Sequence, residues 1–188
     1  MMACNKSATT WNNDQHRGVT LMETMVVLTI LAILAAAALP AFQEMLLHRR
    51  LEGKAREYIS TMNWARSLAV SSHQPVNLRI VEAQSASCYV FFHGPVNDCS
   101  CNASGAACTT PANELLVVVI SHSEGIRVRA RTASTLTRIE PRQGMLSPTL
   151  TAIFTADTGK AIHNISNILG RTRTCTPGQA DFGFPACT

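Results

Sequence analysis

The sequence predicts an α+β protein, in which a long N-terminal hydrophobic α-helix packs on an antiparallel β-sheet globular head. The helix is predicted from a run of 19 uncharged, mostly apolar residues, Thr24 to Phe42. As a helix this run would be ~28 Å long, about the hydrocarbon thickness of a bilayer. The head is predicted from residues 75–188, where short β-branched or aromatic runs alternate with Gly, Pro and polar turns.

The helix should continue beyond Pro40 as an amphipathic extension, so that it runs from about Thr20 to Ala69 and measures roughly 75 Å. Two serines and Pro75 should end it, because proline disfavours helix in the residue before it. The apolar residues that recur at steps of three and four are Leu51, Ala55, Tyr58, Met62, Ala65 and Ala69.

The head should be built from short strands. Leu115–Ile120 is a continuous apolar run and is expected to be a buried strand. Residues 97–113 should form a small-residue and cysteine loop, held by disulfides rather than by a core. The other strand candidates are Val76–Val81, Cys88–Phe92, Ile126–Thr132, Thr135–Ile139, Leu150–Thr155 and Ala161–Leu169.

Residues 17–42, RGVTLMETMVVLTILAILAAAALPAF, resemble the processing site and first helix of type IV pilins and type II secretion pseudopilins. In that family a prepilin peptidase cuts after the glycine and methylates the new amino terminus. The resemblance implies a cut between Gly18 and Val19. It divides the chain into a leader (1–18), a transmembrane and filament-core helix (19–42), an amphipathic helix extension (43–74) and a β-rich head with a disulfide-tied C-terminal tail (75–188). The expected location is the inner membrane, single-pass with a periplasmic head, before incorporation into a pilus or pseudopilus.

Glu23 is the one carboxylate between Gly18 and Phe42. A charged side chain in a membrane helix costs roughly 2.5–3.5 kcal/mol at mid-membrane and less near the interface, so it usually has a partner. We expect that partner to be the α-amino group of Val19, on this or a neighbouring subunit, which gives Glu23 a role in assembly. The alternative is a plain single-pass anchor with Glu23 among the lipid headgroups.

Seven cysteines become six after processing, because Cys4 lies in the leader. An even number in an exported chain favours disulfides. Cys175 and Cys187 bracket the tail and are the preferred pair, which leaves Cys88, Cys99, Cys101 and Cys108 to pair among themselves. A zinc site at the last three lacks a C-x-x-C knuckle and a fourth ligand, so no metal is expected.

Basic residues gather in the last third of the chain, where residues 125–188 contain eight basic and three acidic side chains. This asymmetry indicates an anionic partner. Arg127, Arg129 and Arg131 alternate with small or apolar residues, so in a strand all three project from one face. They are secondary candidates for contact with such a partner, and the alternative is an ordinary solvated face above a buried one.

A second basic motif is GRTRTC, residues 170–175. Its glycine frees the backbone to turn, and Arg171 and Arg173 can both reach a phosphate chain. The segment resembles the G-R-x-R signature of the FimT branch of the GspH/FimT pseudopilin family, whose members are minor type IV pilins with an arginine motif implicated in binding DNA during natural transformation. The resemblance implies Gly170, Arg171 and Arg173 as DNA-binding residues, and Lys160 is a further candidate. The alternative is a solvated turn.

Enzyme chemistry is not expected. The histidines are scattered singly, and Ser121, His122 and Glu124 are adjacent, whereas the groups of a catalytic triad meet through the fold. No cofactor is expected. The sequence thus predicts a minor type IV pilin that binds DNA non-specifically for uptake in natural transformation. Its expected partners are DNA, other major and minor pilins, prepilin peptidase and the inner membrane. The alternative is a structural GspH-type pseudopilin or pilus-priming minor pilin without DNA binding.

Overall fold

The computed structural model describes residues 18–131 and 135–187. A single long helix, α1 (Leu21–Ser72), precedes a head made of short strands. The chain forms two compact units that meet between Ala41 and Phe42. The predicted α+β class, with one long N-terminal helix and an antiparallel β head, is confirmed.

The described part of the first unit is the apolar beginning of α1. Thr20 caps the helix, because its Oγ1 accepts a hydrogen bond from the Glu23 amide at 3.2 Å. The hydroxyls of Thr24 and Thr29 donate to carbonyls one turn earlier, at 2.8 Å each, so they are satisfied inside an apolar segment. The helix is long and apolar enough to cross a membrane, and the side chains of its most apolar window are unburied.

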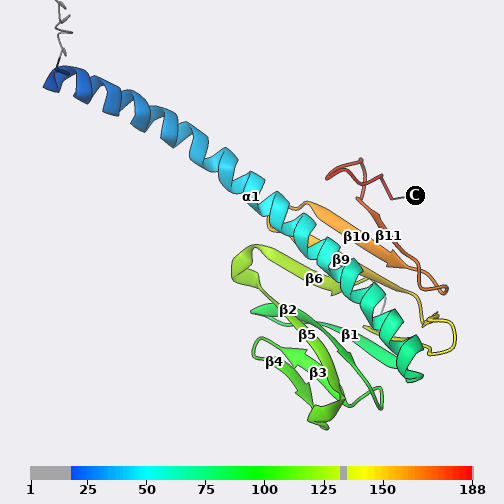
Figure 1. Ribbon diagram of the computed structural model, residues 1–188. Coiled ribbons are helices and arrows are strands. Elements are labelled where there is room, and N and C mark those ends of the chain that lie inside the picture. The colour runs from blue at the N-terminus through cyan, green and yellow to red at the C-terminus, as the bar shows by residue number, and fades with distance from the viewer. Residues whose placement is uncertain (1–17, 132–134, 188) are drawn as a thin grey trace, which may run out of the picture. The chain divides into compact units, whose positions relative to one another are not determined.

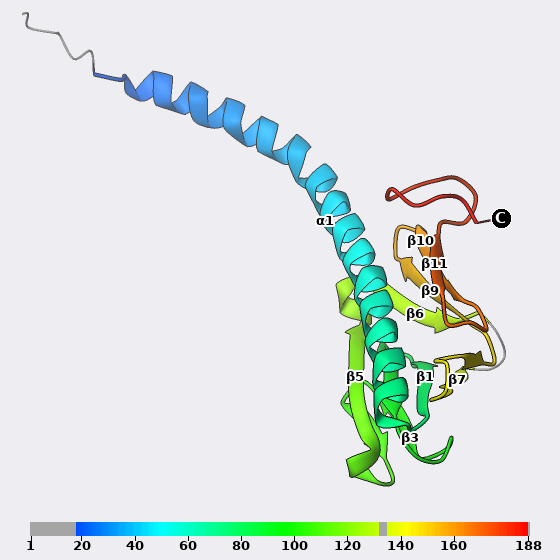
Figure 2. The same cartoon turned by 45° about the vertical axis from the view of Figure 1, so that its right-hand side comes forward.

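The second unit begins with the rest of α1, whose buried face has the predicted spacing of three and four residues. The cyan to green part of the helix runs along the strands of the head in both views (Figures 1 and 2). Tyr58 anchors this contact, with its ring edge-on to Tyr89 at 5.4 Å and to Phe154 at 5.6 Å. The buried residues of this face are Leu51, Ala55, Tyr58, Met62, Ala65 and Ala69.

Two antiparallel sheets share this helix, and Tyr58 touches both, since Tyr89 and Phe154 lie in different sheets. The first sheet has the order β5-β2-β1-β7-β8, and its strands are β1 (Val76–Glu82), β2 (Ala86–Phe92), β5 (Glu114–Ser121), β7 (Leu136–Ile139) and β8 (Leu146–Ser147). The second has the order β11-β10-β9-β6, and its strands are β6 (Ile126–Ala130), β9 (Leu150–Ala156), β10 (Ala161–Ser166) and β11 (Thr172–Cys175).

Residues 97–113 differ from the predicted loop. They contain a hairpin of β3 (Cys99–Asn102) and β4 (Gly105–Cys108), followed by a short 3-10 helix at Pro111–Asn113. Disulfides join Cys88 to Cys101 and Cys99 to Cys108. Cys99 and Cys101 are buried against β2 in a small core of their own, so packing holds this region together with the bridges.

Three strand predictions also need correction. Leu115–Ile120 was expected to be buried, but β5 is the edge strand of its sheet and only Ile120 is fully covered. The strand expected at Ala161–Leu169 ends at Ser166, because Gly170 closes a turn by donating its amide to the Asn167 carbonyl at 2.9 Å. Part of the GRTRTC segment is a strand rather than a loop. The predicted end of the strand at Thr132 lies outside the described residues.

Candidate nucleic-acid interface

The register of the second sheet brings the two predicted arginine motifs onto one surface. Arg129 on β6 lies opposite Ile153 on β9, and Ile153 lies opposite His163 on β10. In the next row the Arg131 amide donates to the Thr151 carbonyl at 2.9 Å. That row continues through Ile165 to Arg173 on β11, because Thr151 pairs with Ile165 and Ile165 with Arg173. Directly opposed residues share a face of a sheet, so these side chains all project on the same side.

That side is the outer face of the sheet. The opposite side carries the buried residues of β6, β9 and β10, and Asn164 there donates to the Ala55 carbonyl of α1 at 2.9 Å. We call the outer surface formed by Arg127, Arg129, Arg131, His163 and Arg173 the basic face. None of the described outward positions on these four strands carries a carboxylate.

His163 lies at the centre of the basic face. Burial, and then the nearby Arg131 and Arg129 guanidiniums, lower the pKa of its imidazole. The register places Arg129 in the same row as His163 and Arg131 in the adjacent row. Ile153, between His163 and Arg129 in the same row, is only 5% exposed although it faces outward. Neighbouring groups on this face therefore cover it.

Arg171 lies at the edge of this face, in the turn between β10 and β11. Its amide donates to Asn167 Oδ1 at 2.9 Å, and the Asn167 amide donates to the Arg171 carbonyl at 3.1 Å. Arg171 and Arg173 line a hollow of 580 Å³ together with Ile165, Asn167 and Thr172. The turn and the strand thus present both arginines of the GRTRTC motif to the same cavity.

Helix α1 braces this turn from behind. Arg66 donates from Nε to the Gly144 carbonyl at 3.0 Å and from Nη2 to the Leu169 carbonyl at 3.2 Å. A guanidinium is suited to this, because its donors form a rigid planar fork. No local pattern predicts this role, because in the sequence Arg66 is one more charged residue on the solvated side of an amphipathic helix.

Two of the predicted cations are engaged by carboxylates. Lys160 Nζ lies 3.1 Å from Asp181 Oδ2 and 5.7 Å from the centre of the Phe182 ring, so it joins β10 to the C-terminal tail. Lys160 precedes β10, whereas the Arg171 turn follows that strand. Arg127 lies 3.7 Å from Asp157.

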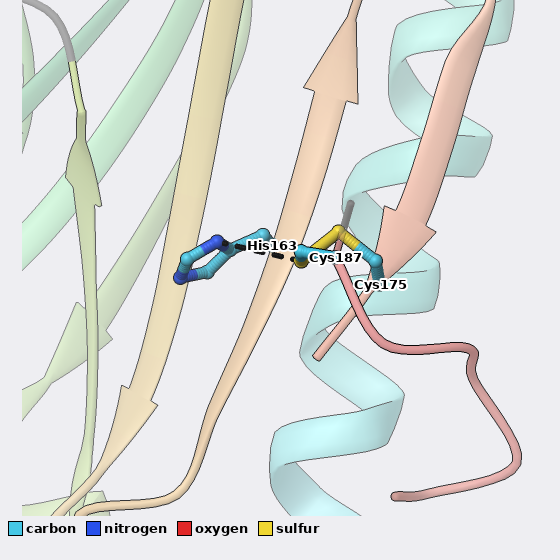
Figure 3. Close-up of side chains that lie close together, drawn as sticks. All are labelled: His163, Cys175 and Cys187. Atoms are coloured by element: carbon cyan, nitrogen blue, oxygen red, sulfur yellow. Dashed lines mark hydrogen bonds between the residues drawn. A yellow bond between two sulfur atoms is a disulfide. The ribbon is translucent and has the colours of Figure 1, made fainter. Parts of the chain in front are cut away.

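The tail is tied beside the basic face. A disulfide joins Cys175, the last residue of β11, to Cys187, and His163 Nδ1 lies 3.7 Å from Cys187 Sγ (Figure 3). The ligating atoms of these three residues lie within 4.8 Å of one another. Because both sulfurs are bonded to each other, they do not supply the thiolates that a zinc site needs. With the disulfide formed, these three residues connect the tail to β10 and β11.

His163 was not among the predicted site residues. In the sequence, Ile162, Asn164 and Ser166 alternate with His163 and Ile165. In a strand, this alternation puts the histidine on the opposite side from the first three residues. That alternation does not say which side faces solvent, because isoleucine occurs on both.

The predicted processing residues lie at the start of the described chain. Gly18 and Val19 precede α1 and are exposed, and Glu23 is exposed in the first helical turn.

Comparison with known proteins matches residues 13–39 to the prokaryotic N-terminal methylation motif. Among solved structures, the type IV minor pilin FimU of Pseudomonas aeruginosa is similar, with 15% identity, 69% of this chain and 94% of that chain covered, and a TM-score of 0.52. The minor pseudopilin EpsH from the type 2 secretion system of Vibrio cholerae has 13% identity, 68% and 97% coverage, and a TM-score of 0.47. No curated protein sequence matches the chain.

The methylation motif and the fold agree: one long N-terminal helix, which begins within the motif, precedes an antiparallel β head, and this is a type IV pilin-like fold.

Proposed function

We propose that the chain is a non-enzymatic minor pilin, cut between Gly18 and Val19 by a prepilin peptidase and methylated at Val19. Residues 19–42 then anchor it in the inner membrane, with the head in the periplasm, until it enters a filament beside other pilins. The methylation motif at residues 13–39 supports this role. Mass spectrometry of membrane-extracted protein should show a chain that starts at Val19. An intact leader in cells with an active prepilin peptidase would contradict it.

We further propose that the basic face binds DNA without sequence preference, as DNA uptake during natural transformation requires. The observation that carries the proposal is the register that gathers Arg129, Arg131, His163 and Arg173 on one sheet surface, where the described outward strand positions carry no carboxylate. Arginine suits this role because its planar fork can form two parallel hydrogen bonds with a phosphate.

The dimensions of the face fit a short stretch of duplex. Adjacent strands lie ~4.8 Å apart, so the backbones at Arg131 and Arg173, three strands apart, are separated by roughly 14 Å. A duplex carries one charge per ~1.7 Å of axis, and 14 Å therefore presents roughly eight phosphates. Phosphate contacts position a protein without reading bases, so binding should be independent of sequence and sensitive to salt.

The test is a DNA titration of the full chain in detergent micelles, at several salt concentrations. We compare Arg171→Gln/Arg173→Gln, Arg129→Gln/Arg131→Gln and a control of equal charge change, Arg49→Gln/Arg50→Gln, on α1. Each face variant should weaken binding to unrelated sequences about equally. Each should also reduce the slope of log affinity against log salt by roughly 0.9 per lost duplex contact.

The alternative is a purely structural pseudopilin or priming minor pilin, whose head contacts sibling pilins. Absence of DNA binding by the wild-type chain at low salt would replace our proposal with this one. If the control variant on α1 weakens binding as much as the face variants do, binding follows net charge and the basic face is not the site.

A further inference from the structure

The turn between β10 and β11 exposes two large apolar side chains. Ile168 is 55% exposed and Leu169 is 60% exposed, the highest values among the large apolar residues of the described head. Burying such side chains elsewhere in the fold would be favourable, because apolar area gains free energy when it leaves water. At the turn of a hairpin the two side chains form a small apolar surface that a partner could cover.

The tip is rigidly held by its backbone. The Ile168 carbonyl accepts from the Leu146 amide at 2.8 Å, and the Leu169 carbonyl accepts from Arg66 Nη2 at 3.2 Å. The hydrogen bonds between Asn167 and Arg171 close the turn. With the main chain fixed on both sides, the two side chains lose little further backbone freedom on contact with a partner.

The charges around the tip select the occupant. Arg171 is separated from Ile168 and Leu169 only by Gly170. Arg173 lines the same hollow as Arg171. The nearest carboxylate in the described lining of the cavity at Ile168 is Glu140, which is paired with Arg138 at 3.1 Å. An apolar tip flanked by arginines is complementary to a polyanion with an apolar interior, namely base pairs between phosphates.

We infer that Ile168 and Leu169 form an apolar wedge that enters the minor groove of duplex DNA and partly unstacks a base step, while Arg171 and Arg173 hold the flanking phosphates. The inference rests on the proposed function and specifies its ligand as duplex rather than single-stranded DNA. Proteins that insert isoleucine or leucine in this way bend the duplex and so bring more of it against their surface. Arg129 and Arg131 would then contact the bent DNA.

The test uses Ile168→Ser/Leu169→Ser in the full chain in detergent micelles, with a duplex of about 20 base pairs that carries a fluorophore at each end. Val96→Ser, which truncates another exposed apolar side chain of the head, is the matched control. Circular dichroism and thermal unfolding establish that each variant is folded.

The wedge variant should lose roughly tenfold or more in duplex affinity. It should also lose the bend that energy transfer reports for the wild type. Its salt dependence should stay unchanged, because apolar contacts release no counterions, whereas Arg171→Gln/Arg173→Gln reduces that slope. Val96→Ser should behave as the wild type.

Two kinds of result overturn the inference in distinguishable ways. If the wild type binds neither the duplex nor a single strand of the same length at low salt, the proposed DNA function fails and the wedge fails with it. If the wild type binds only the single strand, binds the duplex without bending it, or is matched by the wedge variant in affinity and bend, the DNA function stands and the wedge is refuted.

Discussion

Arg66 lies where a side chain at Gly170 would have to be, so that residue 170 has no room for a Cβ. A Cβ at Gly170 would lie 2.3 Å from Arg66 Nε and 2.5 Å from the Gly144 carbonyl oxygen. Gly170 also has φ +75°, a conformation in which side chains are strained. The contact of Arg66 and Gly144 with the turn therefore requires glycine at this position of the GRTRTC motif.

We expect Gly170→Ala to lower the free energy of unfolding by clearly more than Gly159→Ala. Gly159 has a similar φ of +82° but open space around its Cβ position, so it isolates the backbone cost of roughly 1–2 kcal/mol. The remaining loss at Gly170 measures the clash with Arg66 and Gly144. Urea unfolding of the two variants checks this. Equal losses of unfolding free energy would show that Arg66 and Gly144 move aside at little cost.

Cys175→Ser/Cys187→Ser should destabilise the chain by roughly 3 kcal/mol, because the bridge closes a loop of 12 residues. The tail also holds Phe182 against His48, with ring centres 4.7 Å apart, and that contact should loosen with it. Urea unfolding of the oxidised wild type and the variant gives the loss. Peptide mapping without reductant tests the pairing itself, and a Cys175 peptide linked to Cys99 would refute it.

Acid should weaken the fold through His163. Its pKa is lowered by burial and by Arg131 and Arg129, so the folded chain binds this proton less tightly than the unfolded chain, whose histidine has a pKa of ~6.5. At pH values between the pKa of His163 in the folded chain and ~6.5, the unfolded chain binds more protons than the folded chain. The free energy of unfolding therefore falls as the pH falls through this range.

His163→Gln should reduce this decline, measured by urea unfolding at pH 7.5 and 5.0. His73→Gln, in the exposed turn after α1, is the control. An unchanged decline in the His163 variant would assign it to other groups.

Glu23→Ala should leave membrane insertion intact but reduce recovery of the protein in sheared filaments. Removing a carboxylate from an apolar helix lowers the cost of insertion, whereas the proposed pairing with the Val19 amine is lost. Glu44→Ala, beyond the apolar run on the same helix, serves as the control. Normal recovery of the Glu23 variant would show that this carboxylate has no part in assembly.

Local patterns predicted the helix well and the strands unevenly. The face of α1 from Leu51 to Ala69 follows a period that is visible in consecutive residues. The β3–β4 hairpin was missed because its Gly, Ser and Ala residues carry little strand signal. The exposure of β5 was missed because its apolar run is the same whether the strand lies at the centre or at the edge of a sheet.

The sequence by itself determined the long helix, its buried stripe, the β head and the two arginine motifs. Each of these depends on residues that are close together in the sequence. Only the tertiary structure decided that Arg129, Arg131 and Arg173 share a face, and that Arg66 fills the space behind Gly170. Strand order and register arise from the burial of apolar faces under one helix and from hydrogen bonds between distant segments. No local pattern specifies which of those segments become neighbours.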